Sequence, residues 1–250
     1  HVYEEVETVF LITSPHLAPI SSTIIRELHR YGHNVDEFLI VQGDTLDSPQ
    51  ILENDELKKF DVIMANPPYS VKKWSQSKWM NDPFGRNIWG TPPQGCADYA
   101  FQQHIMKSLN PETGRCVVLW PHGVLFRDSE AEIRKRMIEE DYVDAVIGLG
   151  KNLFYNSSME SCLLVCRMKK PKERKGKIIF IDAKEELRID RTNAWLEPQH
   201  IKKISDAYWK CKDAEGFAKV MNNKDVLENG GNLSLQLYVK QVVIENGHNT

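Results

Sequence analysis

The feature that most constrains this chain is a short strand that two prolines end abruptly. Residues 60–65 (FDVIMA) are rich in β-forming side chains and predict a buried strand. Asn66, Pro67, Pro68 and Tyr69 follow directly. The prolines fix φ at two successive positions and remove two N–H donors, so the strand cannot continue past them. We therefore expect a rigid turn at the carboxyl end of a strand, where open α/β sheets bind their ligands.

The groups on this turn suit one reaction, the methylation of an NH2 group. An amide or aromatic amine is a poor nucleophile because its lone pair is delocalised. Two acceptors that take hydrogen bonds from its N–H groups direct the lone pair outward, towards a methyl donor. The side-chain oxygen of Asn66 and the carbonyl of Pro67 are two such acceptors. Tyr69 adds a flat face on which a planar group can stack. The alternative interpretation is that Asn-Pro-Pro-Tyr is only a turn after a strand.

The residues before this turn predict a parallel α/β unit. The apolar runs 9–12 and 38–41 predict two strands, and a helix from Ser21 or Ser22 to about Gly32 connects them. A strand, a helix and a second strand over this length are typical of parallel sheets.

Residues 45–59, before the turn, predict a polar connection with a short helical piece. The segment 70–95, after the turn, shows neither helical nor strand periodicity. Long irregular segments in compact domains are usually functional or disordered. Basic and aromatic residues alternate in 70–95, which suits a flap over an extruded base and its phosphates. The alternative is a surface loop that its tryptophans anchor to the domain. The residues concerned are Lys72, Lys73, Lys78, Arg86, Trp74, Trp79 and Trp89.

The remaining chain continues the α/β pattern. We expect a catalytic domain over 1–195 and a helical and extended tail over 196–250. Within it, the runs 161–166 and 178–182 flank a polar turn and predict an antiparallel pair at the C-terminal edge of a mostly parallel sheet. His104 is interpreted as a packed or capping residue of a helix. Helices are predicted over 98–109, 129–140 and 198–209, and further strands over 115–121 and 143–149.

The composition gives no sign of a strongly basic nucleic-acid-binding surface. The formal net charge is −3 at pH 7, so a DNA-binding chain of this kind would take its phosphate contacts from a local patch or a partner subunit. No cysteine forms a CxxC pair, and Cys116, Cys162 and Cys166 lie in apolar runs, which predicts buried thiols and no metal site. We find no bilayer-spanning run and no signal-peptide pattern, so we expect a cytoplasmic protein.

Asn-Pro-Pro-Tyr resembles the catalytic motif of amino-methyltransferases that use S-adenosylmethionine. These enzymes methylate adenine N6 or cytosine N4 in DNA, or a glutamine amide in peptide release factors. Further stretches are similar to the modification subunit of type I restriction-modification systems, and the resemblance covers roughly residues 36 to 240. These stretches are 42–46 (QGDTL), 97–101 (ADYAF) with His104, 121–126 (PHGVLF), 152–156 (NLFYN), 176–183, 232–233 and 238–239.

The resemblance implies a Rossmann-like S-adenosylmethionine-dependent methyltransferase fold and the methylation of adenine N6 in DNA. It implies that Asp44, Thr45 and Asn66 bind the cofactor, with Asp44 at its adenine amino group. The alternative for Asp44 or Thr45 is a helix or turn cap. Tyr69 would stack the flipped adenine, and Phe154 would help to line the pocket.

The resemblance also implies partners. They are DNA, a specificity subunit, a restriction subunit and a second copy of the modification subunit, with no membrane. In this arrangement another polypeptide reads the DNA sequence, which agrees with the modest charge of this chain.

The sequence departs from the family's pattern at the cofactor site. The family binds the methionine part of S-adenosylmethionine on a Gly-rich turn after its first strand. No such turn occurs here, and Thr13-Ser14-Pro15 does not replace it. An acid after residues 9–12, which would hold the ribose hydroxyls, is also absent. Three explanations stay open: residues missing from the chain, a fragment, or a degenerate paralogue. The functional alternatives are a scaffold that does not bind the donor and a protein-glutamine N5-methyltransferase.

Overall fold

The computed structural model describes residues 9–13, 41, 43–153, 159–191 and 193–240. The chain divides into two compact units, unit 1 over residues 1–118 and unit 2 over residues 119–250. The predicted division into a catalytic domain over 1–195 and a tail over 196–250 stays a prediction. The predicted helix from Ser21 or Ser22 and Phe154 lie outside the described residues, as does the predicted strand 38–41 except for its last residue.

In unit 1, parallel strands carry the Asn-Pro-Pro-Tyr turn. β1 (Val9–Thr13) pairs with β4 (Val62–Asn66) along its whole length. β4 pairs on its other side with β5 (Arg115–Pro121). Both pairings are parallel. The predicted strands 9–12, 60–65 and 115–121 are therefore confirmed, and the first of the motif residues closes β4.

Burial alternates along β4, because successive side chains of a strand point to opposite faces. Ile63 and Ala65 are buried, whereas Met64 between them is 43% exposed. The predicted helix after the irregular segment forms as α3 (Asp98–Lys107) and is buried over most of its length. The buried residues of β4 and α3 thus form the core beside which the Asn-Pro-Pro-Tyr turn lies.

Between residue 45 and β4 the chain forms a small hairpin instead of the predicted helical piece. β2 (Leu52–Glu53) pairs antiparallel with β3 (Glu56–Leu57). Asn54 and Asp55 join them with φ of 53° and 64°. Asn and Asp enter the left-handed region at low cost, and two such residues suit the type I′ turn of a two-residue hairpin. The turn chemistry therefore decides the structure of this connection.

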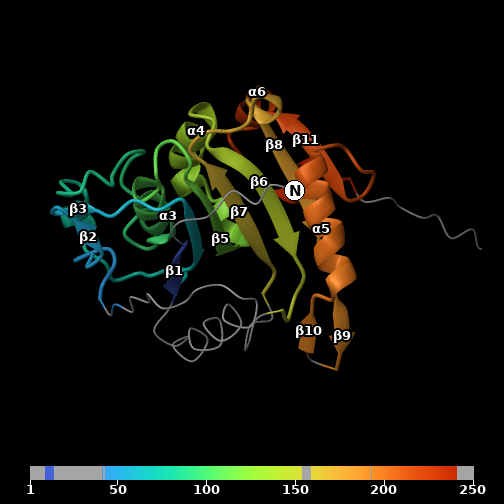
Figure 1. Ribbon diagram of the computed structural model, residues 1–250, viewed down its shortest axis with the longest axis horizontal. Coiled ribbons are helices and arrows are strands. Elements are labelled where there is room, and N and C mark those ends of the chain that lie inside the picture. The colour runs from blue at the N-terminus through green and yellow to red at the C-terminus, as the bar shows by residue number, and fades with distance from the viewer. Residues whose placement is uncertain (1–8, 14–40, 42, 154–158, 192, 241–250) are drawn as a thin grey trace, which may run out of the picture. The chain divides into compact units, whose positions relative to one another are not determined.

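The sheet of unit 2 is mixed. β6 (Val143–Leu149) pairs antiparallel with β7 (Ser161–Arg167) and parallel with β8 (Lys177–Ala183). β11 (Ala218–Asn222) pairs antiparallel with β8 and ends the order β7-β6-β8-β11 (Figure 1). An antiparallel pair, β8 and β11, thus ends this side of the sheet, although the sequence predicted that pair from 161–166 and 178–182.

The predicted partner of 161–166 is wrong, because β6 lies between β7 and β8. β6 is buried at every position. A strand that is buried on both faces lies in the interior of a sheet, with a neighbour on each side. The short polar turn after β7 suggested a hairpin, but the burial of β6 determines which strands pair.

The helices and short elements of unit 2 follow the predicted pattern. The predicted helices over 129–140 and 198–209 are confirmed as α4 and α5. The elements are η2 (His122–Leu125), η3 (Asp128–Glu130), α4 (Ala131–Glu139), η4 (Lys172–Arg174), a hairpin of β9 (Arg188–Asp190) and β10 (Asn193–Trp195), α5 (Pro198–Lys210), α6 (Asn223–Glu228) and α7 (Leu235–Tyr238).

A buried ion cluster joins α5 to the sheet of unit 2. Asp144 on β6 is 1% exposed. Its carboxylate accepts hydrogen bonds from Arg174 Nε at 2.8 Å, Arg167 Nε at 3.2 Å and the Tyr208 hydroxyl at 2.7 Å. The Arg174 guanidinium lies 4.5 Å from the centre of the Tyr208 ring and donates to the Tyr208 carbonyl at 2.7 Å. Burial and then the charge of Asp144 raise the pKa of Tyr208. One carboxylate therefore holds residues of β6, β7, η4 and α5 together.

Candidate active site

The Asn-Pro-Pro-Tyr turn begins where β4 ends. Pro67 is buried, whereas Asn66, Pro68 and Tyr69 are half-buried. The Tyr69 hydroxyl donates a hydrogen bond to the Asn66 side-chain oxygen at 2.6 Å. A carbonyl oxygen has two lone pairs, so this bond orients the Asn66 amide and leaves a lone pair for a second donor. The tyrosine of the motif thus holds the predicted acceptor in place.

The first turn of α3 fixes the chain as it leaves the motif. Ser70 has a left-handed backbone with φ of 50°, and its N–H donates to Asp98 Oδ1 at 2.6 Å. The Ala97 N–H donates to the Val71 carbonyl at 3.2 Å. Asp98 is 1% exposed and opens α3, where the helix dipole favours a negative charge. Sequence reasoning missed this role of Asp98. An acid within a buried helix was the available signal, since buried charges need partners.

The segment 70–95 is a folded loop, as the anchoring interpretation predicts. It contains α2 (Gln76–Trp79), and Trp79 and Trp89 are 2% and 1% exposed. The Trp89 N–H donates to Gln103 Oε1 at 2.7 Å, and Gln103 Nε2 donates to the Gly90 carbonyl at 3.0 Å. The buried indoles and the Gln103 amide therefore attach the loop to α3.

Gln94 joins the two ends of this loop. Its side-chain NH2 donates to the carbonyls of Lys72 and Trp74 at 3.2 Å and 3.1 Å. Its backbone carbonyl accepts a hydrogen bond from the Trp74 indole N–H at 3.0 Å. Trp74 is half-buried by this arrangement, whereas Lys72 and Lys73 are exposed. The two lysines are the predicted DNA-contacting residues that the structure leaves at the surface of this loop.

Arg86 was predicted among the basic residues of a DNA-facing flap, but it is buried. It is 2% exposed, and its guanidinium pairs with Asp82 at 2.6 Å and contacts His104 Nδ1 at 3.3 Å. Since the guanidinium can only donate, His104 Nδ1 accepts and the imidazole is neutral. Burial, and then the Arg86 charge, lower the pKa of His104 from 6.5 to about 3. His104 is a packed residue, as predicted.

We expect this histidine to make the stability of the chain depend on pH. Between pH 6.5 and about 3 the unfolded chain binds a proton at His104 that the folded chain does not. Stability is therefore fully present above pH 6.5 and falls with pH, by up to about 1.4 kcal/mol per pH unit from this group. His104→Asn keeps an acceptor for Arg86 and removes the titration. Urea unfolding at pH 7, 6 and 5 should show a smaller loss for the variant. Parallel losses in both proteins would contradict the assignment.

Asp44 caps a turn. Its Oδ1 accepts hydrogen bonds from the Leu46 and Asp47 N–H groups, each at 3.0 Å, and the Ser48 N–H donates to the Asp44 carbonyl at 2.9 Å. This is the capping role that we left open from sequence. The side chain is exposed, and a carboxylate has two oxygens, so a cap through Oδ1 is compatible with a ligand contact through Oδ2. Thr45 beside it is half-buried.

The residues present fit the two ends of an S-adenosylmethionine molecule unequally. An exposed carboxylate at Asp44 suits the amino group of an adenine, and the oriented amide of Asn66 suits the reacting end. The Gly-rich turn that would hold the methionine part has no counterpart in this sequence, whose first glycine is Gly32.

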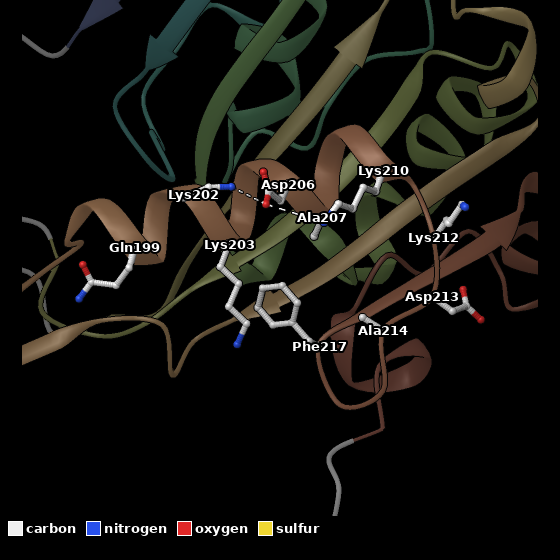
Figure 2. A pocket seen from close by; sticks show the side chains of 10 residues that line it. All are labelled: Gln199, Lys202, Lys203, Asp206, Ala207, Lys210, Lys212, Asp213, Ala214 and Phe217. Carbon is white, nitrogen blue, oxygen red and sulfur yellow. Dashed lines mark hydrogen bonds and ion pairs between the residues drawn. The ribbon is translucent and has the colours of Figure 1, made fainter.

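One hollow among the described residues does not involve the predicted site. A hollow of about 450 Å³ lies beside α5 in unit 2 (Figure 2), and no predicted site residue lines it. Two of its lysines have acidic partners, since Lys202 pairs with Asp206 at 2.8 Å and Lys203 pairs with Glu186. Among the described residues no three His, Cys, Asp or Glu side chains are grouped to hold a metal ion. None of the helices in that part of the chain combines the length and hydropathy of a membrane span.

The parallel strands of unit 1, the mixed sheet of unit 2 and the Asn-Pro-Pro-Tyr turn at the end of β4 define a Rossmann-like fold of the S-adenosylmethionine-dependent methyltransferases. The chain belongs to the N-6 DNA methylase family, whose family model matches residues 27–246. The predicted family is thereby confirmed.

Relatives of the chain are methylase subunits of type I restriction enzymes. The MjaVII methylase subunit of Methanocaldococcus jannaschii is 33% identical over 229 residues, which are 86% of this chain and 38% of the relative. The MpnII methylase subunit of Mycoplasma pneumoniae is 33% identical over 217 residues, 83% of this chain and 39% of the relative. The chain thus spans about two fifths of the length of these curated relatives. In three dimensions it is similar to the type I restriction-modification methyltransferase subunit of Streptococcus thermophilus, with a TM-score of 0.76 and 32% identity over 85% of this chain and 45% of that one.

Proposed function

We propose that this chain is the catalytic part of a DNA methyltransferase that transfers a methyl group from S-adenosylmethionine to the N6 amino group of adenine. The observation that carries the proposal is the Asn66 amide, which the Tyr69 hydroxyl orients at the carboxyl end of β4. Membership of the N-6 DNA methylase family supports the choice of substrate.

Asn66, Pro67 and Tyr69 activate and orient the amino group in this mechanism. One N–H of a flipped adenine donates to Asn66 Oδ1 and the other to the Pro67 carbonyl, which turns the nitrogen lone pair away from the ring plane. The Tyr69 ring stacks on the base and offsets part of the few kcal/mol that extrusion costs. S-adenosylmethionine supplies an electrophilic methyl group on a sulfonium sulfur. The amino nitrogen that accepts this methyl group would become cationic and would then lose a proton to water, since no group of this chain is needed as a base.

This chain would bind the adenine end and the reacting end of the donor. Asp44, beside Thr45, would accept a hydrogen bond from its adenine amino group, and Asn66 would lie near its reacting end. The proposed partners are those that the resemblance to type I modification subunits implies: DNA, a specificity subunit, a restriction subunit and a second copy of this subunit, in the cytoplasm. The net charge of −3 supports a separate DNA-reading subunit.

The test measures the transfer of a labelled methyl group from S-adenosylmethionine by the assembled complex. DNA and peptide release factor are assayed side by side as acceptors. We expect label in DNA only, recovered as N6-methyladenine after digestion to nucleosides. Label in a release-factor glutamine would overturn the proposal.

A scaffold that does not bind the donor is the alternative that the sequence leaves open. Calorimetry with S-adenosylmethionine separates the two. Tight binding excludes the scaffold, whereas a folded protein that binds no donor and transfers no methyl group establishes it.

Lys72 and Lys73 are expected to contact DNA phosphates. The double variant Lys72→Gln/Lys73→Gln should raise the dissociation constant for DNA in the complex. It should also reduce the slope of log K against log salt concentration by about 2, because each lost phosphate contact removes about 0.9. Fluorescence anisotropy at several salt concentrations measures both.

The matched control for this double variant is Lys172→Gln/Lys175→Gln, which makes the same charge change on exposed residues of another surface turn. We expect no change in the slope for the control. An equal change in both double variants would show a general charge effect and contradict the assignment.

A further inference from the structure

Every N–H donor of the Arg86 guanidinium is used. Nε donates to Asp82 at 3.1 Å, Nη2 donates to Asp82 at 2.6 Å and to the Leu46 carbonyl at 2.8 Å, and Nη1 donates to the Thr45 carbonyl at 2.7 Å and to His104 Nδ1 at 3.3 Å. A guanidinium has five N–H groups in a fixed plane. This set of acceptors therefore matches its full capacity and leaves it one orientation.

Aromatic rings enclose the same group. The Trp79 ring centre lies 4.7 Å and the Phe84 ring centre 5.4 Å from the Arg86 guanidinium carbon. Asp82 is 2% exposed at its side chain, as is Arg86. Charged hydrogen bonds are strong in such a water-excluded environment, and their strength depends on geometry. The loop that carries Arg86 is therefore fixed to the groups that accept hydrogen bonds from its guanidinium.

What Arg86 binds, besides its own loop and α3, is the turn that follows Asp44. The carbonyls of Thr45 and Leu46 both point to the guanidinium. On the other side of this turn, Asp44 Oδ1 accepts from the N–H groups of Leu46 and Asp47. The Leu46 peptide groups are thus held by Arg86 through the carbonyl and by Asp44 through the N–H. A movement of these peptides would redirect the Asp44 carboxylate.

We propose that Arg86 is a positioning residue for S-adenosylmethionine: it fixes the 44–47 turn and thereby aims the Asp44 carboxylate at the adenine end of the donor. The inference rests on the proposed function of Asp44. Lysine cannot replace Arg86 in this role, because a point charge on a flexible stem does not reach two carbonyls, a carboxylate and an imidazole in one plane.

The test compares Arg86→Lys with Arg174→Lys in the full chain. Both changes remove a buried guanidinium that is paired with a carboxylate and packed against aromatic rings. We expect Arg86→Lys to raise KM and the dissociation constant for S-adenosylmethionine about ten- to hundredfold, the equivalent of one or more charged hydrogen bonds, with kcat changed much less. Arg174→Lys should lower stability without changing either constant.

Hydrogen exchange provides a readout that does not require donor binding. Arg86→Lys should accelerate exchange at the amides of Leu46, Asp47 and Ser48, and Arg174→Lys should not. In Arg86→Ala, added guanidinium ion at concentrations well below denaturing ones should partly restore donor affinity. Asp82→Asn keeps the arginine but weakens its orientation, so it provides a milder variant if Arg86→Lys does not fold, with a smaller rise in KM expected.

The outcomes separate the two proposals. If a folded Arg86→Lys, or Asp82→Asn in its place, binds the donor like the wild type and exchanges the 44–48 amides at the wild-type rate, the positioning role is overturned. If the wild type itself binds no donor, the proposed function fails. If the wild type and Arg174→Lys bind the donor and Arg86→Lys binds it more weakly, both the proposed function and the positioning role are supported.

Discussion

Asn66→Ala should lower the rate of methyl transfer by about 10²- to 10³-fold, the effect of removing one preorganised hydrogen-bonding group from a reacting centre. The side chain is half-buried and fixed by the Tyr69 hydroxyl, and alanine removes its acceptor oxygen. The Pro67 carbonyl remains and explains a residual rate. Single-turnover transfer to DNA, with donor and DNA saturating, measures the chemical step directly.

The control for Asn66→Ala is the same change at Asn81, which is exposed in the same unit. Asn81→Ala should transfer methyl groups at the wild-type rate. Asn66→Ala should keep the circular dichroism and the subunit assembly of the wild type, because its side chain is not part of the hydrophobic core. Wild-type transfer by a folded Asn66→Ala would falsify the catalytic assignment of the turn.

Asp144→Ala should lower the free energy of unfolding by about 3–5 kcal/mol, since it leaves buried arginines without their counter-ion. Arg174 is 5% exposed, and the pairs of Asp144 with Arg174 and Arg167 are 2.8 Å and 3.2 Å long. The Tyr208 hydroxyl loses its acceptor as well. Urea unfolding followed by circular dichroism at neutral pH measures the change.

Lys202→Ala is the matched control, because it removes an ion pair from the exposed side of α5, the helix that the Asp144 cluster holds against the sheet. Lys202 and its partner Asp206 are 74% and 43% exposed at their side chains. Such pairs contribute little to stability, and the variant should unfold at almost the wild-type urea concentration. A midpoint for Asp144→Ala close to that of the control would show that the buried cluster does not stabilise α5.

The sequence predicts best those features that arise from a few adjacent residues. β4 and the turn after it follow from an apolar run and two prolines, and α3 follows from its helical spacing. The hairpin at Asn54 and Asp55 was also encoded locally, in two residues that accept positive φ. It was missed because its strands are only two residues long.

Features that depend on distant partners could not be predicted in the same way. Arg86 looked like a surface cation, because nothing near it in sequence shows that the Thr45 and Leu46 carbonyls, 41 and 40 residues away, fill its donor sites. The order of β6, β7 and β8 likewise depends on which strand can bury both faces. The position of Asp98 under Ser70 joins residues 28 apart. In each case contacts between residues that are distant in sequence determine the structure, and the local sequence pattern does not show which residues these are.

The bonds that Gln94 makes to Lys72 and Trp74 bear on how the proposed contacts with DNA can be changed. Because these bonds tie the two ends of the loop together, exposed side chains beside them can be changed without moving the ends. Substitutions at exposed loop positions such as Lys72, Lys73 and Ser77 are therefore a suitable way for protein engineers to change what reaches the duplex, whereas Asp82 and Arg86 must stay in place.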